Sequence, residues 1–348
     1  MRRPLIRLTV RAVALAYPVL LAVFAVVLTF VGESWWVSSA ALYLPRVAFA
    51  VPLLLLVALL VLTKNHEWLW TQAVAALVLL FPVMGLVVPL PNLPRPATAD
   101  RPHVRVMAFN IDSAAAGVDA LVDEIDHYSP DVLILVEIGA VEELTRALEA
   151  RYRTVDWAGQ FLTASRYALV SRVDPERVAF GGRQRSPRFL VETLDTPLGA
   201  MTFYVVHPIS PRDDLPALAG AHGFRTLFSA GHLNATDGPG RVEANSGLRE
   251  AQIRATMELA SHDPGPFVVA GDTNLPGLSR VARQYFASLS DGFPSAGAGF
   301  GYTYPAKHPW MRIDRILASS QLEFTRFEVG SSKNSDHLCV VGDLTSRR

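Results

Sequence analysis

The stretch Phe267-Val268-Val269-Ala270-Gly271-Asp272-Thr273-Asn274 joins four apolar residues to a glycine and three polar residues. Short apolar runs that end at Gly, Asp or Asn are typical of buried strands. Ligand sites in sheet proteins gather at strand ends, because loops there are free to present side chains. We therefore expect Asp272 and Asn274 to belong to a functional site; the alternative is that the pair only opens a loop as an Asx turn.

Polar residues stand beside other predicted strands in the same way. The strands at residues 104–109, 132–136, 201–206 and 338–341 are flanked by Asn110, Asp112, Glu137, His207, Asp336 and His337. Carboxylate and amide oxygens suit Mg²⁺, Mn²⁺ or Ca²⁺, and no Cys cluster or paired-His spacing indicates zinc. Simpler interpretations exist: Glu137 as a solvated surface residue, Asp112 as a turn or cap residue, and His207 as a strand terminator.

Strands and helices alternate after residue 103. Helical patterns at residues 118–128, 141–150 and 248–260, together with several adjacent strands, fit α/β or α+β packing around sheets. Residues 208–247 form a segment of forty residues between a strand and a helix, and loops of this length are usually functional or disordered. Its first half, residues 215–228, fits an amphipathic helix, whereas residues 234–246 are rich in Gly, Asn and Asp and predict a flexible segment.

The first ninety residues carry most of the hydrophobic excess. Apolar runs at residues 12–31, 40–62 and 68–90 are each near the ~20 residues that span a bilayer as a helix. Three long runs argue against a cleaved signal peptide followed by a buried core, since a signal peptide has one short apolar region. We expect three transmembrane helices at residues 1–90, a Pro-rich linker at 91–102 and a globular domain at 103–348. Arg46, near the start of the second run, is expected to extend to the membrane interface.

Charge asymmetry predicts the orientation of these helices. Arg2, Arg3, Arg7 and Arg11 precede the first run and Lys64 separates the second from the third, whereas the loop at residues 32–39 contains Glu33 and no basic residue. The positive-inside rule places the N-terminus and Lys64 in the cytoplasm. An odd number of spans then places the globular domain outside, in a multi-pass protein of the cell membrane.

The net charge of zero conceals a second asymmetry. Residues 1–100 contain seven Lys or Arg and three Asp or Glu, which leaves 25 basic and 29 acidic residues for the remainder. Proteins that grip nucleic acid along its length usually show the opposite balance. The single cysteine, Cys339, excludes an internal disulfide and is expected to be a small buried residue.

Six segments, taken in order, resemble the motif set of the endonuclease/exonuclease/phosphatase superfamily. They are Phe109-Asn110-Ile111-Asp112, Leu135-Val136-Glu137, Val206-His207-Pro208, Gly271-Asp272-Thr273-Asn274, Ile313-Asp314-Arg315-Ile316-Leu317 and Ser335-Asp336-His337. The resemblance implies a four-layer α/β sandwich for residues 103–348. The apolar first part, with the motifs at residues 207–211 and 302–305, is similar to a membrane-anchored extracytoplasmic branch that includes teicoplanin-resistance proteins of the VanJ type.

The resemblance also implies a role for each motif residue. Glu137 would be the principal ligand of Mg²⁺, or of Mn²⁺ or Ca²⁺, helped by Asn110, with Asp112 and Asp336 near the ion directly or through water. Asp314 would orient His337, although it is otherwise a buried partner for a neighbouring arginine. Asp272 and His337 are rival general bases, Asn274 would position the water or the phosphate, and His207 would donate to a phosphate oxygen.

Three functions fit these expectations. The first is an extracytoplasmic metal-dependent phosphoesterase acting on a lipid-linked phosphate, such as a polyprenyl carrier, beside its partner the lipid bilayer. The second is an extracytoplasmic nuclease, which the acidic balance does not favour. The third is a non-catalytic membrane-anchored binding module, which the full set of polar motif residues argues against.

Overall fold

Two mixed sheets of six strands each pack face to face in the C-terminal part of the chain. The computed structural model describes residues 2–89, 101–212, 214–215, 238–331 and 334–347. The first sheet has the order β13-β14-β1-β2-β4-β3, in which only β1 and β2 are parallel neighbours. Its strands are β1 (Val104–Asn110), β2 (Val132–Val136), β3 (Thr154–Ala158), β4 (Phe161–Ser165), β13 (Leu322–Val329) and β14 (Val340–Ser346).

The second sheet has the order β11-β12-β10-β9-β8-β5, and its parallel neighbours are β9 and β10. Its strands are β5 (Ala168–Val173), β8 (Phe189–Thr196), β9 (Gly199–Val206), β10 (Phe267–Asp272), β11 (Ser290–Asp291) and β12 (Asp314–Ala318). A separate hairpin consists of β6 (Val178–Phe180) and β7 (Arg183–Arg185).

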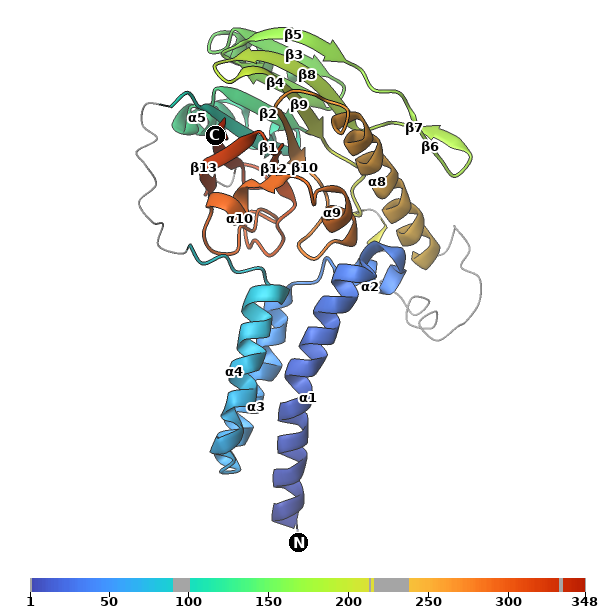
Figure 1. Cartoon of the computed structure of the whole chain (residues 1–348), viewed down its shortest axis with the longest axis vertical. Coiled ribbons are helices and arrows are strands. Elements are labelled where there is room, and N and C mark those ends of the chain that lie inside the picture. The colour runs from blue at the N-terminus through green and yellow to red at the C-terminus, as the bar shows by residue number, and fades with distance from the viewer. Residues whose placement is uncertain (1, 90–100, 213, 216–237, 332–333, 348) are drawn as a thin grey trace.

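Alternation along the strands produces four layers, which agrees with the sandwich that the resemblance to the family implies. Val106 and Ala108 of β1 face the core between the sheets, whereas Met107 and Phe109 face outward. Helices α5 (Val118–Tyr128) and α6 (Val141–Glu149) cover that outer face. Helices α8 (Gly238–Ala260) and α9 (Arg280–Tyr285) cover the outer face of the second sheet (Figure 1), and the short α10 (Gly292–Ala296) lies beside β12 and β13. Cys339 is buried, as predicted.

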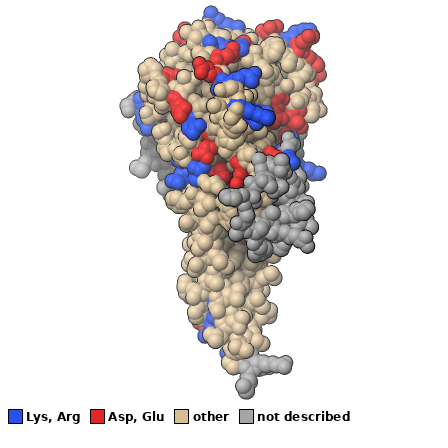
Figure 2. Space-filling model, turned by 90° about the vertical axis from the view of Figure 1, so that its right-hand side faces the viewer, with Lys and Arg blue, Asp and Glu red and all other residues tan. Residues whose placement is uncertain are grey.

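The apolar N-terminal runs form helices that extend from the sandwich as a stalk (Figure 1). They are α1 (Arg2–Phe30), η2 (Arg46–Phe49) with α3 (Ala50–Leu62), and η3 (His66–Trp68) with α4 (Leu69–Val78) and the π-turn η4 (Leu79–Val83). Pro4–Phe30 and His66–Val83, of 27 and 18 residues, are long and apolar enough to cross a bilayer, whereas Arg46–Leu62 is shorter. Figure 2 shows few charged residues on the stalk between the sandwich and the far tip.

The third apolar run ends as a helix earlier than predicted. The π-turn ends at Val83 just after Pro82, and Val87 then pairs with Gly299 of the sandwich as an isolated β-bridge. Proline removes a backbone donor, which favours an end to the helix. The third run still has the length of a span, so two of the three predicted spans have sufficient length and the second, Arg46–Leu62, does not. Val87, after the end of the third helix, contacts the sandwich.

The segment between α1 and α3 docks on the sandwich. It contains η1 (Gly32–Ser34) and α2 (Trp36–Ala41). The Glu33 carboxylate accepts hydrogen bonds from the backbone N–H of Arg280 (3.0 Å) and from Ser279 at the start of α9, and Ser39 Oγ lies 2.8 Å from Ser246 Oγ of α8. Arg46, predicted to extend to the membrane interface, is instead buried between the two parts of the chain. It donates to the backbone carbonyls of Leu42 and Val83 in the N-terminal part and of Gly277 in the sandwich, so its charge is satisfied inside the protein.

Residues 238–246, predicted to be flexible, belong to α8. Their low helix propensity is offset by packing against α2, where Glu243 Oε1 accepts from the backbone N–H of Trp36 at 3.3 Å. The predicted helix at residues 215–228 and the linker at residues 91–102 lie almost wholly outside the described residues.

Candidate active site

Strand pairing brings the polar motif residues to one edge of the sandwich. In the parallel pair β1–β2, Asn110 is the partner of Val136, so Asn110 and Glu137 lie at the same strand end. In the parallel pair β9–β10, Gly271 is the partner of Val206, so Asp272 and His207 also share an end. Antiparallel pairing places Asp314 of β12 opposite Asp272. We call Asn110, Glu137, His207, Asp272 and His337 the Asp272 cluster.

Gly271 permits the close approach of β10 to β9 at this edge. Its φ is 135°, and a Cβ atom built there would lie 2.2 Å from the Val206 carbonyl oxygen. Only glycine adopts this conformation without strain and leaves room for that carbonyl. Gly271 therefore allows the close approach of the two strands that places the Asp272 carboxylate beside His207.

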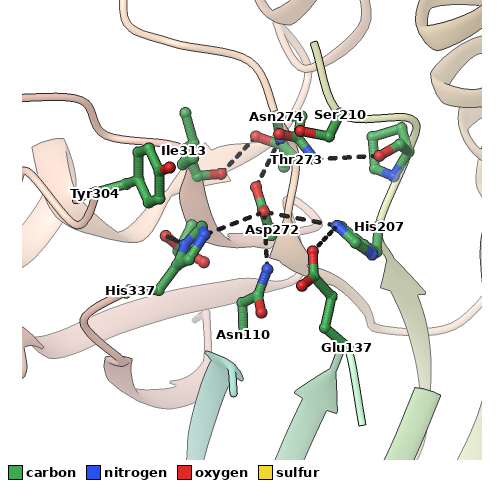
Figure 3. Close-up of polar contacts among 12 residues, drawn as sticks. Asn110, Glu137, His207, Ser210, Asp272, Thr273, Asn274, Tyr304, Ile313 and His337 are labelled. Atoms are coloured by element: carbon green, nitrogen blue, oxygen red, sulfur yellow. Dashed lines mark hydrogen bonds and ion pairs between the residues drawn. The ribbon is translucent and has the colours of Figure 1, made fainter. Parts of the chain in front are cut away.

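The Asp272 carboxylate lies at the centre of the cluster (Figure 3). Its Oδ2 accepts from Asn110 Nδ2 at 3.2 Å and lies 3.7 Å from His207 Nε2 and 3.8 Å from His337 Nε2. Its Oδ1 accepts from the backbone N–H of Asn274 at 2.8 Å. Asp272 and Asn274 therefore form the Asx turn that was the alternative to a functional role. The turn also fixes the orientation of the Asp272 carboxylate.

Glu137 faces His207 across the edge. Glu137 Oε1 lies 3.2 Å from His207 Nε2, and this contact outweighs burial and lowers the pKa of Glu137 to about 2. Glu137 is therefore ionised at neutral pH. Gln160, between β3 and β4, donates to the His207 carbonyl (3.3 Å), so its Oε1 is the atom that accepts from His207 Nδ1 at 2.8 Å. No pattern in the sequence distinguishes Gln160.

His337 is held by Asp314. Asp314 Oδ2 lies 2.9 Å from His337 Nδ1, and both side chains are buried. Burial alone would lower the pKa of His337, but Asp314 and Asp272 outweigh it and raise the pKa to about 9. The imidazole is therefore protonated at neutral pH. The Tyr304 ring packs beside it, with centroids 4.6 Å apart.

The two remaining predicted metal ligands lie at the margin of the cluster. Asp336 Oδ2 accepts from Arg212, which also donates to the Tyr304 hydroxyl at 3.1 Å. Asp112 lies in a 3₁₀ turn with φ 42°, and its backbone N–H donates to Asn110 Oδ1 at 3.2 Å. Their role as ligands stays a prediction. Arg212 was not predicted as a site residue. Its position directly after the motif at residues 207–211 is the one feature of the sequence that indicates it.

The cluster has the donors that a divalent cation needs. Asp272, Asp314 and His337 offer ligand atoms within 4.8 Å of one another, but Asp314 and His337 are already paired with each other at 2.9 Å. Glu137, ionised and half-buried beside the amide of Asn110, is the better ligand. Among the described residues, the buried atoms His207 Nε2 and Asp314 Oδ1 have no hydrogen-bond partner. A carboxylate and amide donor set of this kind fits Mg²⁺, Mn²⁺ or Ca²⁺.

A pocket of about 200 Å³ opens onto the cluster. Its polar side includes Glu137, Asp272, Asn274, His337 and Arg212. Its other side is largely apolar and includes Tyr43, from the segment between α1 and α3. The Tyr43 hydroxyl donates to the Asn274 carbonyl at 3.0 Å and accepts from Arg249 at 2.8 Å, and burial raises the pKa of Tyr43 to about 12. A larger cavity of about 320 Å³ between η4 and the sandwich includes no residue of the Asp272 cluster.

Comparisons with known proteins agree with this architecture. The model of the Endonuclease/Exonuclease/phosphatase family matches residues 107–337. The crystal structure of an endonuclease/exonuclease/phosphatase from Beutenbergia cavernae DSM 12333 is 19% identical, with 71% of this chain and 72% of that chain covered and a TM-score of 0.50. TDP2 from C. elegans is 17% identical, with 71% and 77% covered and a TM-score of 0.50. At these identities the two structures establish the fold alone. No curated protein matches the chain.

Proposed function

Since the chain belongs to the endonuclease/exonuclease/phosphatase family, we propose that it hydrolyses a phosphate ester at the Asp272 cluster with the help of a divalent cation. Members of this family are hydrolases of phosphoester bonds and typically depend on a metal. The observation that carries the proposal is the convergence of one ionised carboxylate, one central carboxylate and two imidazoles at a single edge of the sandwich.

The roles follow from the geometry. Glu137 and Asn110 would hold the cation, which when bound polarises a phosphoryl oxygen and offsets charge on the leaving oxygen. His337, protonated and fixed by Asp314, donates to the phosphate. His207 Nε2 faces the phosphate from the opposite side of Asp272 and would donate to it when both ring nitrogens carry a proton, because Nδ1 already donates to Gln160. Asp272 then takes the proton of the attacking water, because His337 already carries its proton at neutral pH. Asn274 is fixed by its backbone N–H, which donates to Asp272 Oδ1, and by its Nδ2, which donates to the Pro208 carbonyl at 3.1 Å, so its side-chain oxygen would position the water.

We also propose that the domain lies outside a cell membrane, anchored by its apolar helices. Two helices of sufficient length and the basic residues before α1 support this topology, with Arg46–Leu62 as a third and shorter span. The favoured substrate is a lipid-linked phosphate, pyrophosphate or phosphodiester, because a domain anchored beside the outer surface of the bilayer would have such a head group within reach. The excess of acidic residues after residue 100 makes nucleic acid the less favoured substrate.

The test is hydrolysis by the purified full-length protein. With Mg²⁺ it should release phosphate from a generic ester, and chelation of the metal, Glu137→Ala or His337→Ala should each abolish the release. Full activity in either variant would contradict the assignment of the site. A panel of polyprenyl pyrophosphate, sphingomyelin, single-stranded DNA and double-stranded DNA then ranks the substrates, and a clear preference for DNA would reverse the order that we propose.

A further inference from the structure

The pocket beside the Asp272 cluster has an apolar side that no step of phosphate hydrolysis requires. Six residues form it, and we call them the apolar subsite: Tyr43, Pro211, Leu215, Trp310, Met311 and Ile313. They come from three separate parts of the chain: the segment between α1 and α3, the residues after β9, and the approach to β12. A phosphate held between His207 and His337 has the subsite as its immediate neighbour.

The stalk and the sandwich build this subsite together. Trp310 Nε1 donates to the Tyr43 carbonyl at 3.2 Å, and the Tyr43 hydroxyl donates to the carbonyl of Asn274 at 3.0 Å. These bonds join the segment between α1 and α3 to the loop before β12 and to the end of β10. The subsite is therefore a fixed surface rather than a gap between two loosely joined parts.

Exposed apolar residues follow Tyr43 in the chain. Leu44, directly after Tyr43, is 51% exposed, and Val47 and Val51, at the start of the helix formed by η2 and α3, are each 58% exposed. The segment between α1 and α3, which carries Tyr43, lies at the end of the sandwich from which the apolar helices emerge (Figure 1). Exposed apolar residues are expected where a surface meets lipid or an apolar ligand.

On the premise of the phosphoester hydrolysis proposed above, we propose that the apolar subsite binds a hydrocarbon group joined to the reacting phosphate. The substrate is then an amphiphile that reaches the Asp272 cluster from the bilayer, with its phosphate at the cluster and the first part of its chain against Tyr43 and Trp310. Trp310 and Leu215 are specificity-determining residues, because they contact the chain and not the phosphate.

The experiment measures how affinity depends on chain length. Butyl-, hexyl- and octylphosphonate, which carry a C–P bond that is not hydrolysed, are titrated with Mg²⁺ into the full-length protein in lipid nanodiscs, and the heat from empty nanodiscs is subtracted. Burial of each methylene should lower Kd about fourfold until the subsite is filled. Trp310→Ala should reduce the change to below twofold per methylene, and Leu215→Ala, on a different element, should reduce it in the same direction.

Trp35→Ala is the matched control. Trp35 lies in the same N-terminal segment, is 45% exposed and does not line the pocket, so its removal should leave the dependence on chain length as in the wild type. A Kd that is independent of chain length in the wild type would overturn the proposal. The proposal would also be overturned if Kd depended on chain length in both Trp310→Ala and Leu215→Ala as it does in the wild type.

Hydrolysis of octyl phosphate, measured in parallel, separates this inference from the proposed function. Binding that improves with chain length but is not followed by hydrolysis would refute the proposed function and support the subsite. Hydrolysis without dependence on chain length would support the proposed function and refute the subsite.

Discussion

Gly271 controls the distance between two parts of the Asp272 cluster. We expect Gly271→Ala to force β10 away from the Val206 carbonyl, because the new Cβ atom would lie 2.2 Å from that oxygen. Overpacking of this kind costs about 1–3 kcal/mol, and the displaced Asp272 should lose most of the phosphoesterase activity. Thermal unfolding and hydrolysis of a generic ester are the measurements.

Gly199→Ala is the control for the backbone alone. Gly199 also has a positive φ, of 97°, but nothing lies within 4 Å of a Cβ atom built there. Its substitution should cost only the strain of the left-handed conformation, about 1–2 kcal/mol, and should leave hydrolysis intact. Equal loss of activity in both variants would show that crowding at Val206 is not the cause.

Glu192 is a second residue whose surroundings lead to a prediction, this time for stability. It lies inside the sandwich on β8, and burial, with Asp156 beside it, raises its pKa to about 8. An unfolded glutamate ionises near pH ~4.3. Between these values the unfolded chain releases a proton that the folded chain keeps, so the stability of the fold falls as pH rises from about 4.3 toward 8 and levels off above.

Glu192→Gln should therefore become more stable relative to the wild type as pH rises. The difference should grow by about 1.4 kcal/mol per pH unit inside this window. Tm measured from pH 5 to 9 tests it, with the exposed Glu176→Gln as a control that shows no such trend. A constant difference in Tm across the series would contradict the raised pKa.

At the scale of elements, the segment between α1 and α3 acts as a connector between helices of the stalk and helices of the sandwich. Glu33 accepts from the backbone N–H groups of Arg280 (3.0 Å) and Val281 (3.3 Å) at the start of α9, where a carboxylate also interacts favourably with the helix dipole. Glu33→Ala should lower stability by about 1–2 kcal/mol and, by loosening the segment that carries Tyr43, should reduce hydrolysis. Thermal unfolding and kcat/KM are the measurements.

Glu67→Ala provides the comparison for Glu33→Ala. Glu67 pairs with Arg11 at the exposed far end of the stalk, and its side chain is 58% exposed. Exposed ion pairs contribute little, about 0–1 kcal/mol, so this variant should keep both stability and activity. Loss of activity on the same scale as in Glu33→Ala would mean that the stalk as a whole, rather than its junction with α9, supports the site.

At the scale of the whole molecule, the proposed topology places the N-terminus in the cytoplasm and the C-terminus on the other side of the membrane. A reporter fused after Arg348 should be active outside the cytoplasm, and the same reporter inserted beside Lys64 should be active in the cytoplasm, because the basic residues stay inside. Cytoplasmic activity at Arg348 would contradict the extracytoplasmic domain and with it the access of the pocket to the outer surface of the bilayer.

The residue patterns of the sequence by themselves predicted strands and helices packed around sheets and the polar residues at the strand ends, whereas the sandwich followed from the resemblance to the family. Buried strands have a two-residue period, and polar residues that end parallel neighbours such as β1 and β2 must meet at one edge. Asn110, Glu137, His207, Asp272 and His337 could therefore be named from short local patterns. The catalytic and metal-binding roles of these residues stay predictions until they are tested.

Only the tertiary structure showed how the N-terminal part of the chain contributes to the pocket of the site. Tyr43 and Asn274, which share a hydrogen bond, are 231 residues apart, and Gln160 and His207 are 47 apart. The first residues of α8 are helical because α2 packs on them, against their own propensity. Contacts of this kind depend on the docking of whole elements, and no local pattern of residues encodes them. The sequence thus determined which residues end the strands, and the fold decided that an apolar N-terminal segment forms one wall of their pocket.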